Sequence, residues 1–325
     1  MTAALTAIPA ATWDPQMRAA FDLLNGIAAS HPPMVMAEPF GRARAINEAI
    51  NVPLAEGGPA MADTTEHWVA VRGRRVLCRV HRPSTRHPLP ALVYFHGGGW
   101  VLSSIDTHDR VAREYAASGE VATVIVDYAL SPEARFPRAL LECADIVRHL
   151  ASDGAAWGLD PACLFVGGDS AGGNLALAVA LLLRDSGEAH KLRGILAAYP
   201  ATDLRMQGTP RHSGPEYWLS MDDMRAFREL YLRDAADRLH PLASPLLADC
   251  AGLPPTLIQL AELDPLYEEG CAMAERLRQA SVAVTLETTP GVLHGFLRLS
   301  RHVEAAARAT EAGGRWLRAM AELGK

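Results

Sequence analysis

A serine between two glycines, Gly168-x-Ser170-x-Gly172, is the pattern in this 325-residue sequence that points most directly to chemistry. Such a pattern is typical of a nucleophilic serine on a sharp turn between a strand and a helix. The neighbours must be small because the turn leaves no room for Cβ groups beside the serine. The bare motif occurs by chance in about one chain in ten of this length. Its position after the apolar run Cys163–Val166 favours a nucleophile over the alternative, a glycine-rich turn with a capping serine.

Three successive glycines, Gly97, Gly98 and Gly99, follow another apolar run, Ala91–Phe95. Glycine loses more conformational entropy on folding than other residues, so three in a row indicate unusual dihedral angles or a close approach to a ligand. Their N–H groups, with that of Ala171 after the serine, are candidates for binding the oxyanion of a tetrahedral intermediate. A phosphate-binding loop is the competing interpretation. The segment lacks the Lys-Ser/Thr pair and the spaced glycines of nucleotide-binding motifs.

A serine nucleophile needs a histidine base, and the base needs a carboxylate that orients it. Five histidines follow Ser170 in the sequence: His190, His212, His240, His294 and His302. His294 is the candidate base because it follows the last predicted strand in a short loop and is flanked by glycines. We expect the other four in polar, solvated segments. His96, before the three glycines, is better suited to orient that loop than to act as a base.

The carboxylate candidate is Asp264, which follows the apolar run Thr256–Leu260 and precedes a proline that stiffens the turn. An aspartate in this position usually only caps a helix. The chain order Ser170, Asp264, His294 favours the catalytic interpretation, because hydrolytic triads on sheets of this kind follow that order. Glu262 is the nearest rival.

Apolar runs and helix-like spacings alternate along the chain and must position these residues. Strands are predicted at residues 68–71, 75–81, 91–95, 122–127, 163–166, 194–199, 256–260 and 282–288. Helices are predicted around 17–27 and 43–50, then at 107–117, 138–151, 171–185, 222–233, 268–279 and 302–323. This alternation predicts an α/β fold with an eight-stranded, mostly parallel sheet and helices on both faces. Ligands of such sheets bind at the carboxyl ends of the strands, where the motifs fall. Ser220 and Asp223 predict a capping box at the start of one helix.

The composition indicates a globular protein and argues against nucleic acid as a partner. Hydrophobic residues make up 49% of the chain, and the formal net charge is −6. The basic residues are scattered apart from Arg72–Arg75, which predicts a solvated turn between two strands. The length suits one large domain, although two small ones would also fit.

Cysteine usage and the absence of targeting signals predict a cytoplasmic protein without a membrane span. The five cysteines are an odd number and show no zinc-like spacing, as expected in a reducing compartment. The segment Met1–Ala20 lacks the basic-then-apolar order of a signal peptide. The longest apolar run, Leu175–Leu183, is too short to cross a bilayer and predicts a buried helix.

Taken together, these motifs resemble the hormone-sensitive-lipase-like family of bacterial esterases, over roughly residue 90 to the C-terminus. The resemblance rests on residues 96–100, 168–174, 264–266 with 269–270, and 294–296. Asp127–Glu133 also resembles a family segment, but Ala129 stands where an arginine is usual and Ser131 where an alanine is usual. That segment supports the fold around the site, so we expect the departure to leave catalysis intact.

The resemblance implies an α/β-hydrolase fold in a single domain of residues 1–325. A helical cap would comprise about residues 1–53 and 204–239, and the catalytic core about 60–203 and 240–325. It implies Ser170, Asp264 and His294 as the catalytic triad. The family points most often to Gly98, Gly99 and Ala171 as oxyanion donors, and Gly97 also stays a candidate.

The activity implied is hydrolysis of carboxylic esters with short or medium acyl chains, without a cofactor. Dimers are common in the family, so a homodimer is one expectation. Two alternatives stay open: amide or formamide hydrolysis by the same triad, and a receptor on this scaffold, similar to the plant gibberellin receptors that have lost the histidine. Candidates for an apolar pocket wall, with ordinary packing as the alternative, are Tyr217, Trp218, Leu219, Met221, Met224, Met34, Met36 and Phe40.

Overall fold

A computed structural model describes residues 13–207, 210 and 212–323, so the first twelve residues of the expected cap lie outside it. Its eight strands form one sheet in the order β1-β2-β4-β3-β5-β6-β7-β8. The strands are β1 (Asp63–Val71), β2 (Arg74–Arg82), β3 (Leu89–Phe95), β4 (Ala122–Val126), β5 (Leu159–Asp169), β6 (Leu192–Ala198), β7 (Thr256–Leu263) and β8 (Val284–Leu293). Strand β2 pairs antiparallel with β1 and with β4, and the other five pairings are parallel. The predicted eight-stranded, mostly parallel sheet is confirmed.

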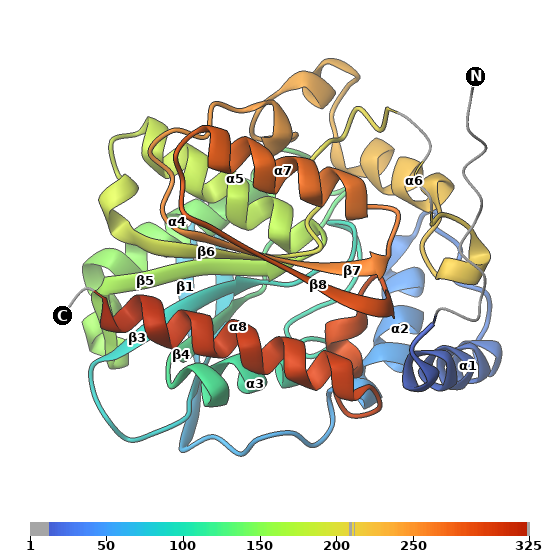
Figure 1. The fold of residues 1–325 in the computed structure, drawn as a ribbon, viewed down its shortest axis with the longest axis horizontal. Helices are drawn as coiled ribbons and strands as arrows, with labels where there is room; N and C mark the ends of the chain where they lie inside the picture. The colour runs from blue at the N-terminus through green and yellow to red at the C-terminus, as the bar shows by residue number, and fades with distance from the viewer. Residues whose placement is uncertain (1–12, 208–209, 211, 324–325) are drawn as a thin grey trace.

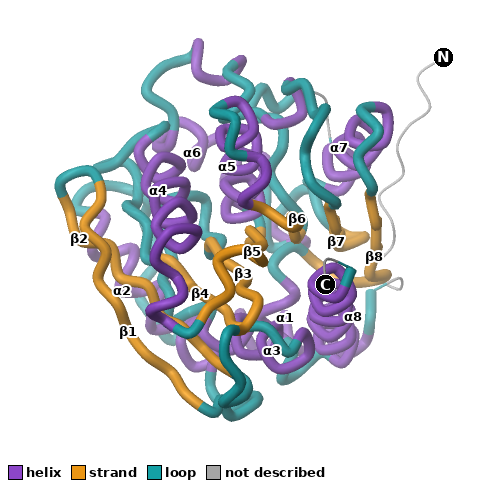
Figure 2. The backbone as a smooth tube through the Cα atoms, turned by 90° about the vertical axis from the view of Figure 1, so that its left-hand side faces the viewer, coloured by secondary structure: helices purple, strands orange, loops and turns teal. Residues whose placement is uncertain are grey.

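Helices cover both faces of this sheet, as predicted. They are α1 (Pro15–Ala29), α2 (Phe40–Asn51), α3 (Asp109–Gly119), α4 (Arg138–Asp153), α5 (Ala171–Asp185), α6 (Met221–Tyr231), α7 (Tyr267–Gln279) and α8 (Glu304–Glu322). Helices α4, α5 and α7 lie on one face, and α3 and α8 lie on the other (Figures 1 and 2). Helices α1, α2 and α6 lie together beyond the carboxyl ends of the strands (Figure 1).

The apolar run Leu175–Leu183 forms the middle of α5, the predicted buried helix. Most of this helix is buried, because it packs on β5 and β6 with α4 beside it. Such all-round burial requires an apolar surface on every side of the helix. The predicted turn at Arg72–Arg75 is the hairpin between β1 and β2, where Arg72 and Gly73 both have positive φ values, of 47° and 81°.

Two of the helices at the carboxyl edge, α1 and α6, begin with side-chain caps, whereas α2 has none and is held by an arginine. Helix α6 begins with the predicted capping box between Ser220 and Asp223. Helix α2 is tied to the core by Arg44, whose Nε donates to the carbonyl of Val101 at 2.9 Å and whose Nη2 donates to that of Ser131 at 2.9 Å. The position of α2 is therefore linked to the segment that follows the three glycines.

Several strands are longer than the sequence predicts, and the extension of β7 and β8 changes how the site is built. Strands β7 and β8 stay paired past an irregularity between Ala261 and Leu263, up to the pair Leu263–Leu293. The expected loop before His294 is therefore strand, which corrects the prediction. Asp264 and His294 each directly follow the last paired residue of neighbouring parallel strands, and this brings the two side chains together.

Candidate active site

Ser170 lies on the turn between β5 and α5. Its φ of 55° and ψ of −117° are values that residues other than glycine rarely adopt, so the turn is strained. A Cβ on Gly168 or Gly172 would overlap the carbonyl oxygen of Phe95 at the end of β3. The two glycines are needed because β3 passes this close to the turn. The strained turn is kept in place partly because the Ser170 N–H donates to the carbonyl of Ala198 at 2.8 Å.

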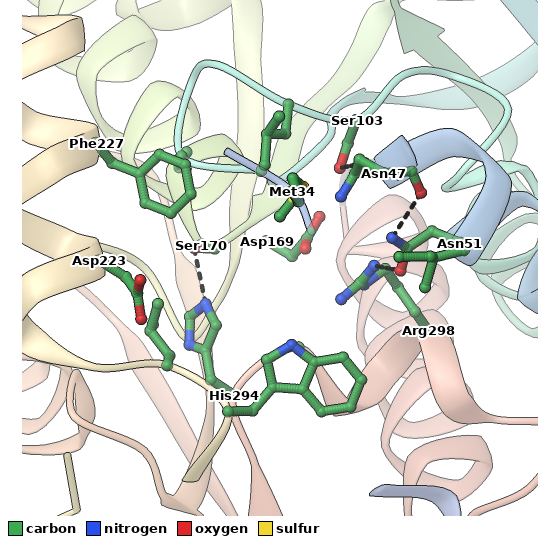
Figure 3. Close-up of a pocket in the computed structure, with 18 of the residues that line it drawn as sticks. Met34, Asn47, Asn51, Ser103, Asp169, Ser170, Asp223, Phe227, His294 and Arg298 are labelled. Atoms are coloured by element: carbon green, nitrogen blue, oxygen red, sulfur yellow. Dashed lines mark hydrogen bonds between the residues drawn. The ribbon is translucent and has the colours of Figure 1, made fainter. Parts of the chain in front are cut away.

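The structure brings Ser170, His294 and Asp264 into one hydrogen-bonded chain. His294 Nε2 lies 2.9 Å from Ser170 Oγ (Figure 3). His294 Nδ1 lies 2.7 Å from Asp264 Oδ2. The Asp264 side chain is buried, and its Oδ1 accepts the N–H of Leu266 at 2.8 Å. With Nδ1 protonated toward the carboxylate, Nε2 is left to accept the proton of the serine hydroxyl.

The alternative candidates for the carboxylate and for the base are not part of this hydrogen-bonded chain. Glu262 belongs to β7, and its Oε2 accepts the N–H of Gly291 at 2.8 Å. Of the other histidines after the serine, three are exposed as expected: His190, His240 and His302. His212 departs from the prediction, because it is buried and its ring lies 5.2 Å from that of Tyr217.

The glycines after β3 divide into two groups. The N–H of Gly97 donates to Asp169 Oδ1 at 2.9 Å, and Gly97 does not line the cavity above Ser170. The amides of Gly98, Gly99 and Ala171 make no hydrogen bond within the described residues, and all three residues line that cavity. The candidate oxyanion donors are therefore reduced to these three, because the Gly97 N–H is already bonded.

Gly98 and Gly99 cannot be replaced without a clash. Their φ values are 115° and 61°, in the region that favours glycine. A Cβ on Gly98 would overlap the carbonyl of Leu102, and one on Gly99 would overlap the ring of Phe227. These contacts give the physical reason for successive glycines that the sequence pattern only suggested.

Behind this loop lies a buried carboxylate, Asp169, whose role the sequence analysis missed. Its Oδ1 accepts the hydroxyl of Tyr94 at 2.8 Å, in addition to the Gly97 N–H, and its Oδ2 lies 3.3 Å from His108 Nε2. Burial alone raises the pKa of Asp169, but the charge and hydrogen bond of His108, the Tyr94 hydroxyl and Arg298 lower it below its ordinary value. The sequence offered one indication of this role, the position of Asp169 inside the serine motif. Its hydrogen-bonding partners come from distant segments and could not be predicted.

His96 is fully buried beside the same loop. Its Nδ1 lies 2.8 Å from the carbonyl oxygen of Gly97, and its ring stacks on that of Tyr128 at 4.4 Å. The Tyr128 hydroxyl donates to the carbonyl of His96 at 2.7 Å. Burial, then the neighbouring His108, lowers the pKa of His96 to about 3.

This shift predicts acid sensitivity of the fold. The folded-state pKa lies below that of a histidine in the unfolded chain, so the unfolded state binds the proton first as the pH falls, and acid destabilises the protein. Because the unfolded chain takes up a proton at His96 first, the free energy of unfolding should fall by about 2 kcal/mol between pH 7 and pH 5. In His96→Asn that loss should shrink by the same amount, as measured by urea unfolding at both pH values. His190→Asn, at an exposed position, is the control. An unaltered pH dependence in His96→Asn would refute the linkage.

A cavity of about 420 Å³ opens above Ser170 and His294. Five of the eight proposed wall residues line it: Met34, Met36, Trp218, Leu219 and Met224. The other three, Phe40, Tyr217 and Met221, pack elsewhere. One side of the cavity is polar and was not predicted, with Asn47, Asn51 and Arg298 (Figure 3). The four-residue spacing of the two asparagines on α2 was the only sequence signal for it.

Within the described ranges, no group of three or more His, Cys, Asp or Glu side chains is placed to hold a metal ion. None of the helices described has both the length and the apolar character needed to cross a membrane.

The sequence is similar to those of known hydrolases. A family model described as alpha/beta hydrolase fold matches residues 92–298. The chain is 38% identical over 237 residues to carboxylesterase NlhH of Mycobacterium tuberculosis. The matched region covers 71% of this chain and 74% of the relative. It is 38% identical over 240 residues to ethyl acetate hydrolase of Pseudomonas putida, covering 72% of this chain and 75% of the relative.

The fold is similar to that of a solved esterase over almost the whole length of the chain. A hyperthermophilic esterase from the archaeon Pyrobaculum calidifontis superposes with a TM-score of 0.86 at 34% identity, covering 95% of this chain and 99% of the other. The relatives are named as ester hydrolases, which favours an enzyme over the receptor alternative. This chain belongs to the hormone-sensitive-lipase-like family of carboxylesterases, which have the α/β-hydrolase fold.

Proposed function

We propose that this carboxylesterase cleaves short- to medium-chain acyl esters through Ser170, His294 and Asp264. The observation that carries the proposal is the hydrogen-bonded chain from Ser170 Oγ through His294 to Asp264, at 2.9 and 2.7 Å. Both distances are within hydrogen-bonding range before any substrate is bound, as nucleophile–base and base–orienter pairs require.

The reaction would proceed in two stages. Ser170 Oγ attacks the ester carbonyl while His294 Nε2 takes the hydroxyl proton, and the same nitrogen then protonates the departing alcohol. A water molecule, activated by His294, hydrolyses the acyl-enzyme that remains. Asp264 holds the ring in the tautomer with Nδ1 protonated and stabilises the imidazolium that forms in each stage.

The amides of Gly98, Gly99 and Ala171 would bind the oxyanion of each tetrahedral intermediate. Ala171 is the first residue of α5, so the positive end of the helix dipole adds to the stabilisation. Asp169 has a positioning role in this proposal: by accepting the Gly97 N–H, it fixes the loop that presents the other two glycine amides.

The cap of about residues 1–53 and 204–239 would set the size of the substrate. Met34 and Met36 from the first cap segment and Trp218 and Met224 from the second line the cavity. A volume of about 420 Å³ is at the lower end of small-molecule sites, which favours short acyl chains. The relative that is named ethyl acetate hydrolase supports the same preference.

Turnover of p-nitrophenyl acetate, butyrate, hexanoate and decanoate tests this proposal. We expect kcat/KM to peak at butyrate or hexanoate and to fall about tenfold or more at decanoate, because a pocket of fixed volume rejects added methylenes. The matched butyryl p-nitroanilide tests the amide alternative and should be cleaved far more slowly. A maximum at decanoate would refute the chain-length preference, and faster cleavage of the anilide would identify an amide hydrolase.

The cytoplasmic location inferred from cysteine usage and the homodimer implied by the family remain part of this proposal. No disulfide joins the five cysteines, and four of them are buried, which is consistent with a reducing compartment.

A further inference from the structure

Arg298 lies beside the proposed catalytic histidine on a short 3₁₀ helix, Phe296–Leu299. Its side chain crosses Gly295, where an added Cβ would lie 3.1 Å from Arg298 Nη2. Arg298 and His294 line the cavity that contains Ser170 (Figure 3). Gly295 lines it as well. A guanidinium therefore faces the same space as the nucleophile.

This guanidinium is only partly bonded. Its Nη1 donates to Asn51 Oδ1 at 2.6 Å. Its Nε and Nη2 make no hydrogen bond within the described part of the chain. Neither nitrogen is fully buried, so both are accessible to solvent in a residue that lines the cavity. No described carboxylate forms an ion pair with Arg298. By contrast, Arg110 and Arg113 on α3 each pair with a carboxylate, Glu114 and Asp109.

A purely structural role as counter-ion of Asp169 does not account for this arrangement. Arg298 contributes to lowering the pKa of Asp169, but less than His108 and Tyr94 do. The Asp169 carboxylate already accepts the Tyr94 hydroxyl and the Gly97 N–H and contacts His108. Its hydrogen-bonding needs are met without Arg298, so the free edge of the guanidinium is left for a ligand.

The surroundings favour an anion at this side of the cavity. Asn47 accepts the Ser103 hydroxyl at its Oδ1, at 3.3 Å, and its Nδ2 has no partner within the described residues. It therefore offers a second donor near Arg298 (Figure 3). On the opposite side of Ser170 lie the ring of Phe227 and the carboxylate of Asp223 (Figure 3). An apolar ring and a negative charge would both disfavour an anion there. Asp169 also lines the cavity, but its carboxylate is buried and is already bonded to the Tyr94 hydroxyl and the Gly97 N–H.

We propose that Arg298 is a specificity-determining residue that binds a carboxylate carried by the ester substrate. The preferred substrates would then be esters that also carry a free, negatively charged carboxylate. Examples are a monoester of a dicarboxylic acid and an acyl ester of a hydroxy acid. The free Nε and Nη2 form an edge that matches the two oxygens of a carboxylate, a geometry that lysine cannot reproduce. This inference rests on the proposed function and narrows its substrate class.

Two pairs of substrates, each an anion with its neutral counterpart, test the proposal. Monoethyl adipate against ethyl hexanoate places the charge on the acyl side, and 5-acetoxypentanoate against pentyl acetate places it on the alcohol side. In one pair the wild type should hydrolyse the anion at least as well as the neutral ester. Arg298→Gln should lower that ratio of kcat/KM values about 10- to 100-fold, mainly through KM, because a charge-assisted pair is lost. Arg298→Lys should restore only part of it.

Arg301→Gln is the matched control. Arg301 is half exposed, forms an ion pair with Glu56 at 3.7 Å and does not line the cavity. The variant removes the same charge and should keep the wild-type ratio. An equal loss on anionic and neutral esters in Arg298→Gln would assign a structural role and overturn the proposal.

A measurement on the unmodified protein makes the test independent of folding in the variants. Adipate should inhibit hydrolysis of a neutral ester competitively and more strongly than the corresponding diamide, and added salt should weaken the inhibition. Equal weak inhibition by both would overturn the role of Arg298. If neutral esters are themselves not hydrolysed, the proposed function fails; if they are hydrolysed without selectivity for anions, only this inference fails.

Discussion

Replacing Ser170 by alanine should lower kcat for p-nitrophenyl butyrate about 10⁵-fold or more, because the nucleophile and the acyl-enzyme pathway are lost together. Residual catalysis should remain from the amides of Gly98, Gly99 and Ala171, which the substitution leaves in place. The fold should persist, since the Ser170 N–H still bonds Ala198 and no side-chain cap of α5 is removed. Steady-state kinetics and a thermal melt measure the two effects.

A fluorophosphonate probe separates loss of the nucleophile from loss of the fold. It should label the wild-type protein on the peptide that contains Ser170 and should not label Ser170→Ala. Ser186→Ala is the matched control, because Ser186 is exposed at the other end of the same helix, where its hydroxyl donates to Leu182 at 2.9 Å. Its turnover should stay within about twofold of wild type. Full activity in Ser170→Ala, or labelling at another serine, would exclude Ser170 as the nucleophile.

Asp264→Asn should lower kcat about 10⁴-fold with little change in KM. The N–H of Leu266 bonds Oδ1 at 2.8 Å, so an asparagine would keep its oxygen there and turn its NH₂ toward His294. An NH₂ group cannot accept the Nδ1 proton, so the ring would adopt the other tautomer. His294 Nε2 would then carry a proton and could not accept the one from Ser170, even with the geometry intact.

Glu262→Gln distinguishes this mechanism from a general effect of charge near the base. Glu262 lies two residues before Asp264 and bonds the Gly291 N–H, which a glutamine oxygen can also accept. Its kcat should therefore stay within about threefold of wild type. If Glu262→Gln were the inactive variant and Asp264→Asn the active one, the carboxylate assignment would be reversed.

The cavity connects these expectations with substrate choice. Its apolar side contains methionines, which adapt to varied acyl groups, while its polar side presents Arg298 and two asparagines of α2. Arg44 fixes α2 to the loop after the glycines through Val101 and to the segment after β4 through Ser131. The polar side, for which we propose carboxylate recognition, thus includes a helix that is anchored to the proposed oxyanion loop.

Much of the fold followed from local patterns in the sequence. Short apolar or β-branched runs identified all eight strands, and several of them are continuously apolar because both of their faces are covered. The run at Leu175–Leu183 identified the central helix. Ser170, Asp264 and His294 could be named because each is a distinctive residue type at a strand end, in the chain order that such sheets use. The glycine motifs were informative for the same reason, since Gly98 and Gly172 stand where a Cβ would overlap backbone atoms.

Only the tertiary structure decided which neighbours these residues have. The pairing of β7 with β8 past an irregularity placed Asp264 next to His294, and this register depends on contacts between segments that no local pattern encodes. The bond between Gly97 and Asp169 removed one oxyanion candidate. The polar side of the cavity arises because α2 and the segment after His294 meet there, far apart in sequence. Local propensity acts over a few residues, whereas substrate selection depends on side chains that folding brings together across the whole chain.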